Sequence, residues 1–180
     1  MSELIRAFIA VKLPEDISDS LEDFLDDIRP LSKIRWVKRE QFHITLKFLG
    51  ELEPDVIDDV IDSLSPMKHF EPFRIELSTI GAFPNMKNAN VLWLGCSRGA
   101  KELSDLSRKV NDALFHDAGL ERDTRKFRAH MTLARLKGER VTDDVINQLG
   151  TFPLMNWLCD ELVLMRSTLT PKGPIYTQIL

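Results

Sequence analysis

Cysteine and metal-binding patterns are scarce in this chain. Only two of its 180 residues are cysteines, Cys96 and Cys159, and they form no Cys-x-x-Cys pair. Zinc sites and disulfide frameworks need more cysteines at closer spacing, so we expect neither and predict two buried, reduced thiols. The four histidines also form no His-x-His or His-x-x-x-His segment. The sequence therefore predicts no metal and no cofactor.

Long apolar runs are missing as well. No segment approaches the roughly 20 consecutive apolar residues of a membrane helix. The start of the chain carries Glu3 and Arg6, and it lacks the basic flank and cleavage site of a signal peptide. We therefore expect a cytoplasmic protein without membrane attachment. Its length and its 43% hydrophobic content suit a single domain over residues 1–180, and a monomer is the default expectation.

An excess of positive charge is the third missing feature. The net charge is −4, which argues against extensive coating of nucleic acid. Basic residues nevertheless gather around two segments, near residues 33–47 and 122–140, whereas acidic residues concentrate at 15–27 and 51–62. A locally basic pocket on an acidic protein suits a small number of phosphates better than a long duplex.

Strands and helices are predicted to alternate irregularly along the chain. Apolar alternation predicts strands, helical spacing of apolar residues predicts helices, and proline or glycine separates them. The expected strands span residues 4–12, 34–37, 42–49, 73–83, 91–96, 127–136, 158–169 and 175–180, and the expected helices span residues 14–29, 54–65, 100–118 and 142–149. Hairpin-like turns join several of these strands, and this order favours an α+β fold.

Two four-residue segments share the pattern His-x-Thr-x, with an aliphatic residue at each x. They are His43-Ile44-Thr45-Leu46 and His130-Met131-Thr132-Leu133, 87 residues apart. Side chains alternate between the two faces of a strand, so the histidine and threonine of each segment share one face. Each strand would thus present one imidazole and one hydroxyl on one face, while its aliphatic residues anchor the other face.

The surroundings of the two motifs also repeat. Each motif strand is followed by a turn, an acidic amphipathic helix with an Asp-Asp pair, and two strands joined by a proline-containing turn. A single repeat of this length indicates two related lobes and not a solenoid. A pseudo-two-fold relation between the lobes would bring His43 and His130 to opposite sides of one ligand.

Two imidazoles and two hydroxyls suit the hydrolysis of a phosphodiester. One imidazole takes a proton from attacking water while the other gives a proton to the departing oxygen. Thr45 and Thr132 could donate hydrogen bonds to non-bridging phosphate oxygens, and a nearby arginine could neutralise charge. The residues alone leave open which histidine is the acid.

The chain resembles the 2H phosphoesterase superfamily, which is named for two His-x-Thr-x motifs. More closely, it resembles the RNA 2′,3′-cyclic phosphodiesterase branch, also called 2′-5′ RNA ligases. The resemblance covers nearly the whole chain and rests on long segments: RWVKREQFHITLKFLGE, FPNMKNANVLWLG, FRAHMTLARLKG and LMRSTLTPKGPIY. Ala129 departs from the family pattern, which usually has proline before the second histidine.

The resemblance implies a bilobal fold with two pseudo-symmetric antiparallel-sheet lobes, outer helices and a central cleft. It also implies metal-free hydrolysis of RNA 2′,3′-cyclic phosphate ends to 2′-phosphates, with His43 as proton donor and His130 as proton acceptor. Thr45 and Thr132 would hold the phosphate. The partners would be RNA ends, tRNA fragments included, or nucleotides. Reversal of the reaction would give 2′-5′ ligation.

Weaker candidates surround the motifs. Arg128, at even spacing from His130, is the preferred phosphate ligand, whereas a straight strand would turn Arg135 away. Phe83 and Trp36 are candidates for stacking on a base, with core packing favoured for Trp36. Further predictions place Trp93 and Trp157 in the core, His69 and His116 on the surface or in helices, and Arg166 along the cleft.

Two alternative functions stay open. The same chemistry could act on small cyclic nucleotides or 2′-5′ oligonucleotides. The chain could also be a module that binds RNA ends without turnover, although pure binding does not require two titrating groups.

Overall fold

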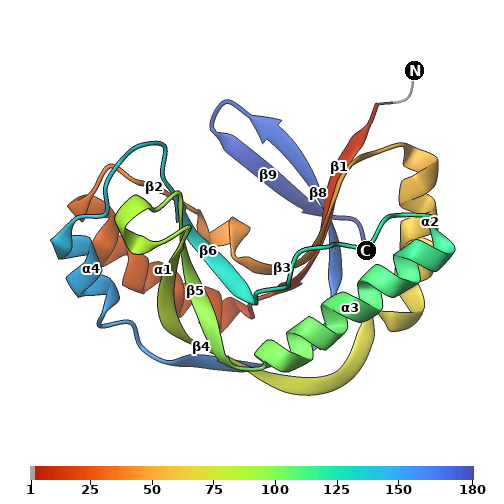
Figure 1. Cartoon of the computed structure of the whole chain (residues 1–180). Helices are drawn as coiled ribbons and strands as arrows, with labels where there is room; N and C mark the ends of the chain where they lie inside the picture. The colour runs from red at the N-terminus through yellow and green to blue at the C-terminus, as the bar shows by residue number, and fades with distance from the viewer. Residues whose placement is uncertain (1–2) are drawn as a thin grey trace.

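The computed structural model describes residues 3–180, which form four α-helices and one antiparallel nine-stranded sheet (Figure 1). The α+β fold class is therefore confirmed. The strands are β1 (Ile5–Lys12), β2 (Arg35–Trp36), β3 (His43–Leu52), β4 (His69–Phe83), β5 (Val91–Arg98), β6 (His130–Arg135), β7 (Met155–Glu161), β8 (Val163–Thr170) and β9 (Gly173–Gln178). The helices are α1 (Glu15–Ile28), α2 (Pro54–Leu64), α3 (Ala100–Asp117) and α4 (Asp143–Leu149).

The strand order shows how the two repeats interleave. The sheet runs β7-β4-β5-β6-β3-β1-β8-β9, with β2 beside β6. Strands β4 and β5 follow the first motif along the chain, yet they extend the half of the sheet that holds the second motif. Strands β8 and β9 follow the second motif and extend the half that holds the first. The two motif strands, β3 and β6, lie at the junction of the halves.

One strand prediction was wrong. The sequence suggested a single strand over residues 158–169, but the structure breaks it at Leu162 into β7 and β8. Strand β7 pairs with β4 at one edge of the sheet, whereas β8 pairs with β1 and β9 in the other half. The backbone N–H of Leu162 donates to the carbonyl of Lys68 instead of joining either ladder. The chain therefore passes from one half of the sheet to the other within a continuous apolar run.

The helices lie in two pairs (Figure 1). Helix α2 packs against α3, and α3 contacts β3, while α1 contacts α4. Each helix buries the apolar stripe that its sequence predicts, such as Leu103, Val110 and Leu114 of α3. Thr142 caps α4 through a side-chain oxygen that accepts the N–H of Val145.

One large core cluster underlies both half-sheets. It includes Ile44 and Met131, the residues inside the two motifs, and neither is exposed to solvent. Cys159 is buried and Cys96 is half-buried; both thiols are free, and burial raises the pKa of each. No helix within residues 3–180 has the length and apolar character needed to cross a membrane.

Candidate active site

The two motif strands are direct neighbours. Strands β3 and β6 pair antiparallel at Ile44 and Met131, which lie between the histidine and threonine of each motif. Because both residues point into the core, the histidines and threonines lie on the opposite face. Because the strands are antiparallel, His43 lies on the same side of this pair as Thr132, and Thr45 lies on the same side as His130. The structure thus places the two motifs side by side; that they act as one catalytic site stays a prediction.

Each motif ends in a β-bulge. Leu46 in β3 is skipped in the pairing with β1, and Leu133 in β6 is skipped in the pairing with β5. An extra residue shifts the alternation of all later side chains to the other face. Phe48 and Arg135, each two residues after the bulged leucine, are therefore exposed on the face of the histidines.

Both imidazoles are oriented by the main chain. Nδ1 of His43 lies 2.7 Å from the carbonyl oxygen of Gln41, and Nδ1 of His130 lies 2.7 Å from that of Arg128. A carbonyl oxygen only accepts hydrogen bonds, so Nδ1 carries the hydrogen in both rings. Nε2 is therefore the atom left for proton transfer. In His43, Nε2 lies 2.9 Å from Oγ1 of Thr45.

Burial controls the charge of both histidines. Burial lowers the pKa of His43 to about 4; the Gln41 carbonyl opposes this shift, while the positive charges of Arg135 and His130 add to it. Burial also lowers the pKa of His130, with the Arg128 carbonyl opposing and Arg135 contributing. Both rings are thus neutral at neutral pH in the free protein. A bound phosphate anion would favour the return of one proton.

Arg135 is the arginine whose charge reaches both histidines. Burial is the main cause of the lowered pKa of His43 and of His130, and the charge of Arg135 adds to both shifts; at Tyr176, whose pKa burial raises, the same charge acts in the opposite direction. The prediction that Arg135 points away was wrong, because it assumed a straight strand and the bulge at Leu133 reverses the alternation. The side chain of Arg128 is exposed beside the cavity next to His130, and its role as a phosphate ligand stays a prediction.

Aromatic rings flank each imidazole. Ring centroids of Phe8 and Tyr176 lie 4.8 and 5.4 Å from that of His43. Those of Phe83 and Trp93 lie 5.1 and 6.3 Å from that of His130. Phe83 was a sequence candidate, whereas Phe8 and Tyr176 were missed.

The three tryptophans differ in their surroundings. Trp93 was expected in the core, but its half-buried ring lies beside His130. Its indole extends over Gly81 and Gly95: a Cβ on Gly81 would lie 2.2 Å from Cζ2, and one on Gly95 would lie 2.8 Å from Cζ3. Glycine within a strand often marks such a close approach, so these two residues were the available signal. Trp36 and Trp157 pack with the core, as predicted.

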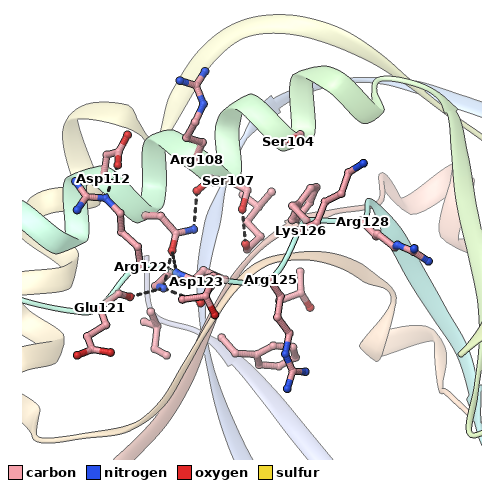
Figure 2. Close-up of a pocket in the computed structure, with 18 of the residues that line it drawn as sticks. Ser104, Ser107, Arg108, Asp112, Glu121, Arg122, Asp123, Arg125, Lys126 and Arg128 are labelled. Carbon is pink, nitrogen blue, oxygen red and sulfur yellow. Dashed lines mark hydrogen bonds and ion pairs between the residues drawn. The ribbon is translucent and has the colours of Figure 1, made fainter. Parts of the chain in front are cut away.

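A cavity of about 1070 Å³ opens beside the motifs (Figure 2). Thr45 and His130 line it, and it extends between α3 and the segment of residues 119–129, which we call the 119–129 loop. His43 and Thr132 are not among its lining residues. The cavity therefore approaches the reacting groups from the Thr45 and His130 side of the strand pair.

Buried Lys47 fixes the 119–129 loop. Its Nζ donates to Oδ1 of Asn111 at 2.7 Å, to the carbonyl of Glu121 at 2.9 Å and to Oδ1 of Asp123 at 3.0 Å. Oδ1 of Asn111 also accepts the backbone N–H of Asp123. The bulge at Leu46 turns Lys47 inward toward these partners, so the first motif strand and α3 together hold the segment that leads to His130.

Other sequence candidates lie apart from this site. His69 and His116 are exposed, as expected. Arg166 forms an ion pair with Glu3 and is not among the residues that line the cavity. Within residues 3–180, no group of three or more histidine, cysteine or acidic side chains is arranged to hold a metal ion. The absence of a cofactor stays a prediction.

The fold and the paired histidine motifs are those of a 2H phosphoesterase. The model of the 2′-5′ RNA ligase superfamily matches residues 17–170, and the chain belongs to this superfamily.

Relatives match over nearly the full length. The RNA 2′,3′-cyclic phosphodiesterase of Archaeoglobus fulgidus is 32% identical over 178 residues, which cover 97% of this chain and 98% of the relative. The protein of the same name from Methanothermobacter thermautotrophicus is 33% identical over 180 residues, covering 97% and 96%.

Solved structures share the fold. TT0787 of Thermus thermophilus superposes with a TM-score of 0.79 at 28% identity, covering 97% of this chain and 95% of that one. E. coli LigT complexed with 3′-AMP gives a TM-score of 0.79 at 23% identity, covering 99% and 97%. The likeness to LigT supports the fold alone.

Proposed function

We propose that this protein hydrolyses RNA 2′,3′-cyclic phosphate ends to 2′-phosphomonoesters by two-histidine general acid–base catalysis. The observation that carries the proposal is the pair of imidazoles on adjacent strands, each with Nδ1 bonded to a main-chain carbonyl and Nε2 left for proton transfer. The names of the archaeal relatives support the substrate class. A cytoplasmic, monomeric protein acting on RNA ends, tRNA fragments included, is part of the proposal.

The reaction needs one proton taken up and one proton given. Nε2 of the base removes a proton from water as the water oxygen bonds to phosphorus. The bond from phosphorus to the ribose 3′-oxygen breaks, and Nε2–H of the acid protonates that oxygen. The family resemblance assigns His43 as the acid and His130 as the base. Each transfer typically contributes about 10²- to 10⁴-fold to the rate.

The threonines and Arg135 complete the proposed phosphate site. Thr45 and Thr132 lie on the face of the histidines and would donate hydroxyl hydrogen bonds to non-bridging oxygens. In the free protein Oγ1 of Thr45 contacts Nε2 of His43, so substrate binding would exchange this hydrogen bond for one to phosphate. Arg135 would offset the charge that develops on the phosphoryl oxygens. The reverse reaction with a 5′-hydroxyl would form a 2′-5′ bond.

The test is an end-group assay. We would incubate the protein and EDTA with a short RNA that ends in a 2′,3′-cyclic phosphate, and identify the terminal phosphate. We expect a 2′-phosphate. A 3′-phosphate would show that the 2′-oxygen leaves instead. Tight binding of the RNA without any product would show that the protein is a binding module and not an enzyme.

Single and double variants test the mechanism. His43→Ala and His130→Ala should each lower kcat by at least about 10²-fold, and the double variant should lose little more, because the two groups act in one step. His69→Ala and His116→Ala are matched controls on exposed histidines and should retain activity. Retention of activity by either motif variant would exclude the two-histidine mechanism.

A further inference from the structure

The cavity beside His130 is larger than one reacting phosphate requires. Its volume of about 1070 Å³ is at or above the roughly 300–1,000 Å³ that small-molecule pockets occupy. It extends from Thr45 and His130 along the 119–129 loop to α3. A terminal cyclic nucleotide at the histidines would therefore leave most of this cavity open for the chain to which it is attached.

The cations along the cavity fall into two groups. Lys47 is bonded to Asp123, Arg122 to Asp112, and Arg108 to Asp105, so the charges of the first group are already compensated. Arg125, Lys126 and Arg128 form the second group. They are exposed, and the structure of residues 3–180 gives their side chains no hydrogen bond or ion pair. These three charges are available to an anionic ligand.

Figure 2 shows how these side chains lie on the loop. Arg122 turns back toward Asp112 on α3, whereas Arg125, Lys126 and Arg128 project from the loop in different directions. Residues 125 to 128 of an extended chain span at most about 10 Å. The three free cations thus leave a short stretch of chain in different directions, and they suit more than one phosphate better than a single one.

Aromatic rings line the same cavity. Phe48 is 62% exposed, although it is a large apolar side chain on a strand, and Phe127 is half-buried. Basic side chains that follow a phosphate backbone, together with aromatic rings that accept bases, are the usual combination in single-strand binding sites. Exposure of Phe48 costs stability in the free protein and fits a surface that a base covers.

We propose that the 119–129 loop and the cavity beneath it bind the RNA chain on the 5′ side of the cyclic phosphate. Arg125 and Lys126 would contact backbone phosphates, and Phe48 would stack on a base. The inference rests on the proposed function, because it assumes that the cyclic end is bound at the two histidines. Lys47 holds the loop in place before RNA arrives, which limits the ordering that binding requires.

Two substrates separate this proposal from the chemistry itself. We would compare a cyclic mononucleotide with a six-nucleotide RNA that ends in the same cyclic nucleotide, using the variant Arg125→Ala/Lys126→Ala. We expect KM for the RNA to rise at least tenfold, and kcat/KM for the mononucleotide to stay within twofold of the original protein. For the RNA, the dependence of log kcat/KM on log salt should become shallower by up to about 1.4, since about 0.7 is lost per phosphate contact.

The matched control removes two positive charges outside the cavity. Lys101 and Lys109 are exposed on α3 and do not line the cavity. Lys101→Ala/Lys109→Ala should leave KM for the RNA within about twofold, because salt screens exposed charges that do not contact the RNA. An equal effect of both double variants, or an equal loss on both substrates, would overturn the proposal.

A binding measurement keeps the test independent of turnover. Fluorescence anisotropy with a labelled RNA that ends in a 2′-phosphate should show at least a tenfold rise in Kd for Arg125→Ala/Lys126→Ala. Phe48→Ala should raise Kd for the RNA by about 5- to 150-fold, the usual effect of losing one stacked base. An unchanged Kd in both variants would exclude the loop as the RNA site, even if the proposed hydrolysis itself were not observed.

Discussion

The ammonium nitrogen of Lys47 lies 2.7 Å from Oδ1 of Asn111, deep between β3 and α3. Lys47 follows the first motif, and Asn111 accepts the N–H of Asp123 from the loop that leads to the second motif. The pair therefore ties the two motifs together through a segment without regular secondary structure. Only 4% of the Lys47 side chain is exposed, so these acceptors take the place of water as the hydrogen-bond partners of its ammonium group.

Replacing Lys47 tests this connection. Lys47→Met keeps the length of the side chain but leaves the Glu121 carbonyl without its buried donor. We expect the free energy of unfolding to fall by about 1–3 kcal/mol, measured by urea denaturation. KM for an RNA substrate should rise more than KM for a cyclic mononucleotide. Lys109→Met, an exposed lysine on α3, is the control and should change stability by less than about 0.5 kcal/mol.

The pH dependence of kcat/KM follows from the two lowered histidine pKa values. The active form has one imidazole protonated and one neutral. Burial lowers both pKa values, that of His43 to about 4, so in the free protein the singly protonated pair gives way to two neutral rings as the pH rises toward neutral. We therefore expect kcat/KM for a cyclic mononucleotide to peak on the acidic side of pH 6.5. Above the peak it should fall by up to about tenfold per pH unit.

Bound substrate should shift the profile. A phosphate anion stabilises the protonated imidazole, so the maximum of kcat should lie at higher pH than that of kcat/KM. Initial rates between pH 4 and pH 9, in buffers of constant ionic strength, would give both profiles. A kcat/KM that rises from pH 6.5 to pH 8 would contradict the lowered pKa values.

Substitutions of Arg135 and Arg128 test whether the bulge at Leu133 turns Arg135 toward the phosphate. If Arg135 faces the phosphate, Arg135→Met should lower kcat/KM by about 10- to 150-fold, equivalent to about 1.5–3 kcal/mol for a charged hydrogen bond. Loss of its charge should also raise the pKa of both histidines and move the optimum of kcat/KM to higher pH. Arg128→Met should have a smaller effect and leave the optimum in place. The reverse order would favour the straight-strand interpretation.

The position of the Trp93 indole requires that residues 81 and 95 have no side chain. Gly81→Ala would place a Cβ 2.2 Å from Cζ2, so the ring must move from its position beside His130. We expect a loss of about 1–3 kcal/mol in the free energy of unfolding, together with reduced kcat. Gly150→Ala would place a Cβ 3.2 and 3.5 Å from two carbonyl oxygens and should change stability by less than about 1 kcal/mol. Near-ultraviolet circular dichroism would report the displaced indole.

Much of the fold could be predicted because local signals were strong. Helix α3 has a clear apolar stripe and ends before Gly119, which adopts a positive φ of 65°. The two His-x-Thr motifs were predictable as a pair because strand alternation and the internal repeat agree. The organisation of residues 1–180 as one domain of two interleaved lobes stays a prediction.

The errors come from features that have no local sequence signal. The crossing at Leu162 depends on which neighbouring strand each half of the segment joins, and the apolar run looks the same in both cases. The position of Arg135 depends on a bulge, which changes the face of a side chain without changing composition. Tyr176 reaches His43 from β9, more than a hundred residues away, and only the sheet order could reveal it.

The carbonyl oxygens that hold the two imidazoles have an evolutionary consequence. Every amino acid brings the same carbonyl, so the tautomer of His43 does not depend on the side chain at position 41, nor that of His130 on the side chain at position 128. Substitutions at position 128 can then alter which RNA is preferred without disturbing the proton-transfer geometry. The reaction and the choice of substrate are thereby free to diverge separately among descendants of this fold.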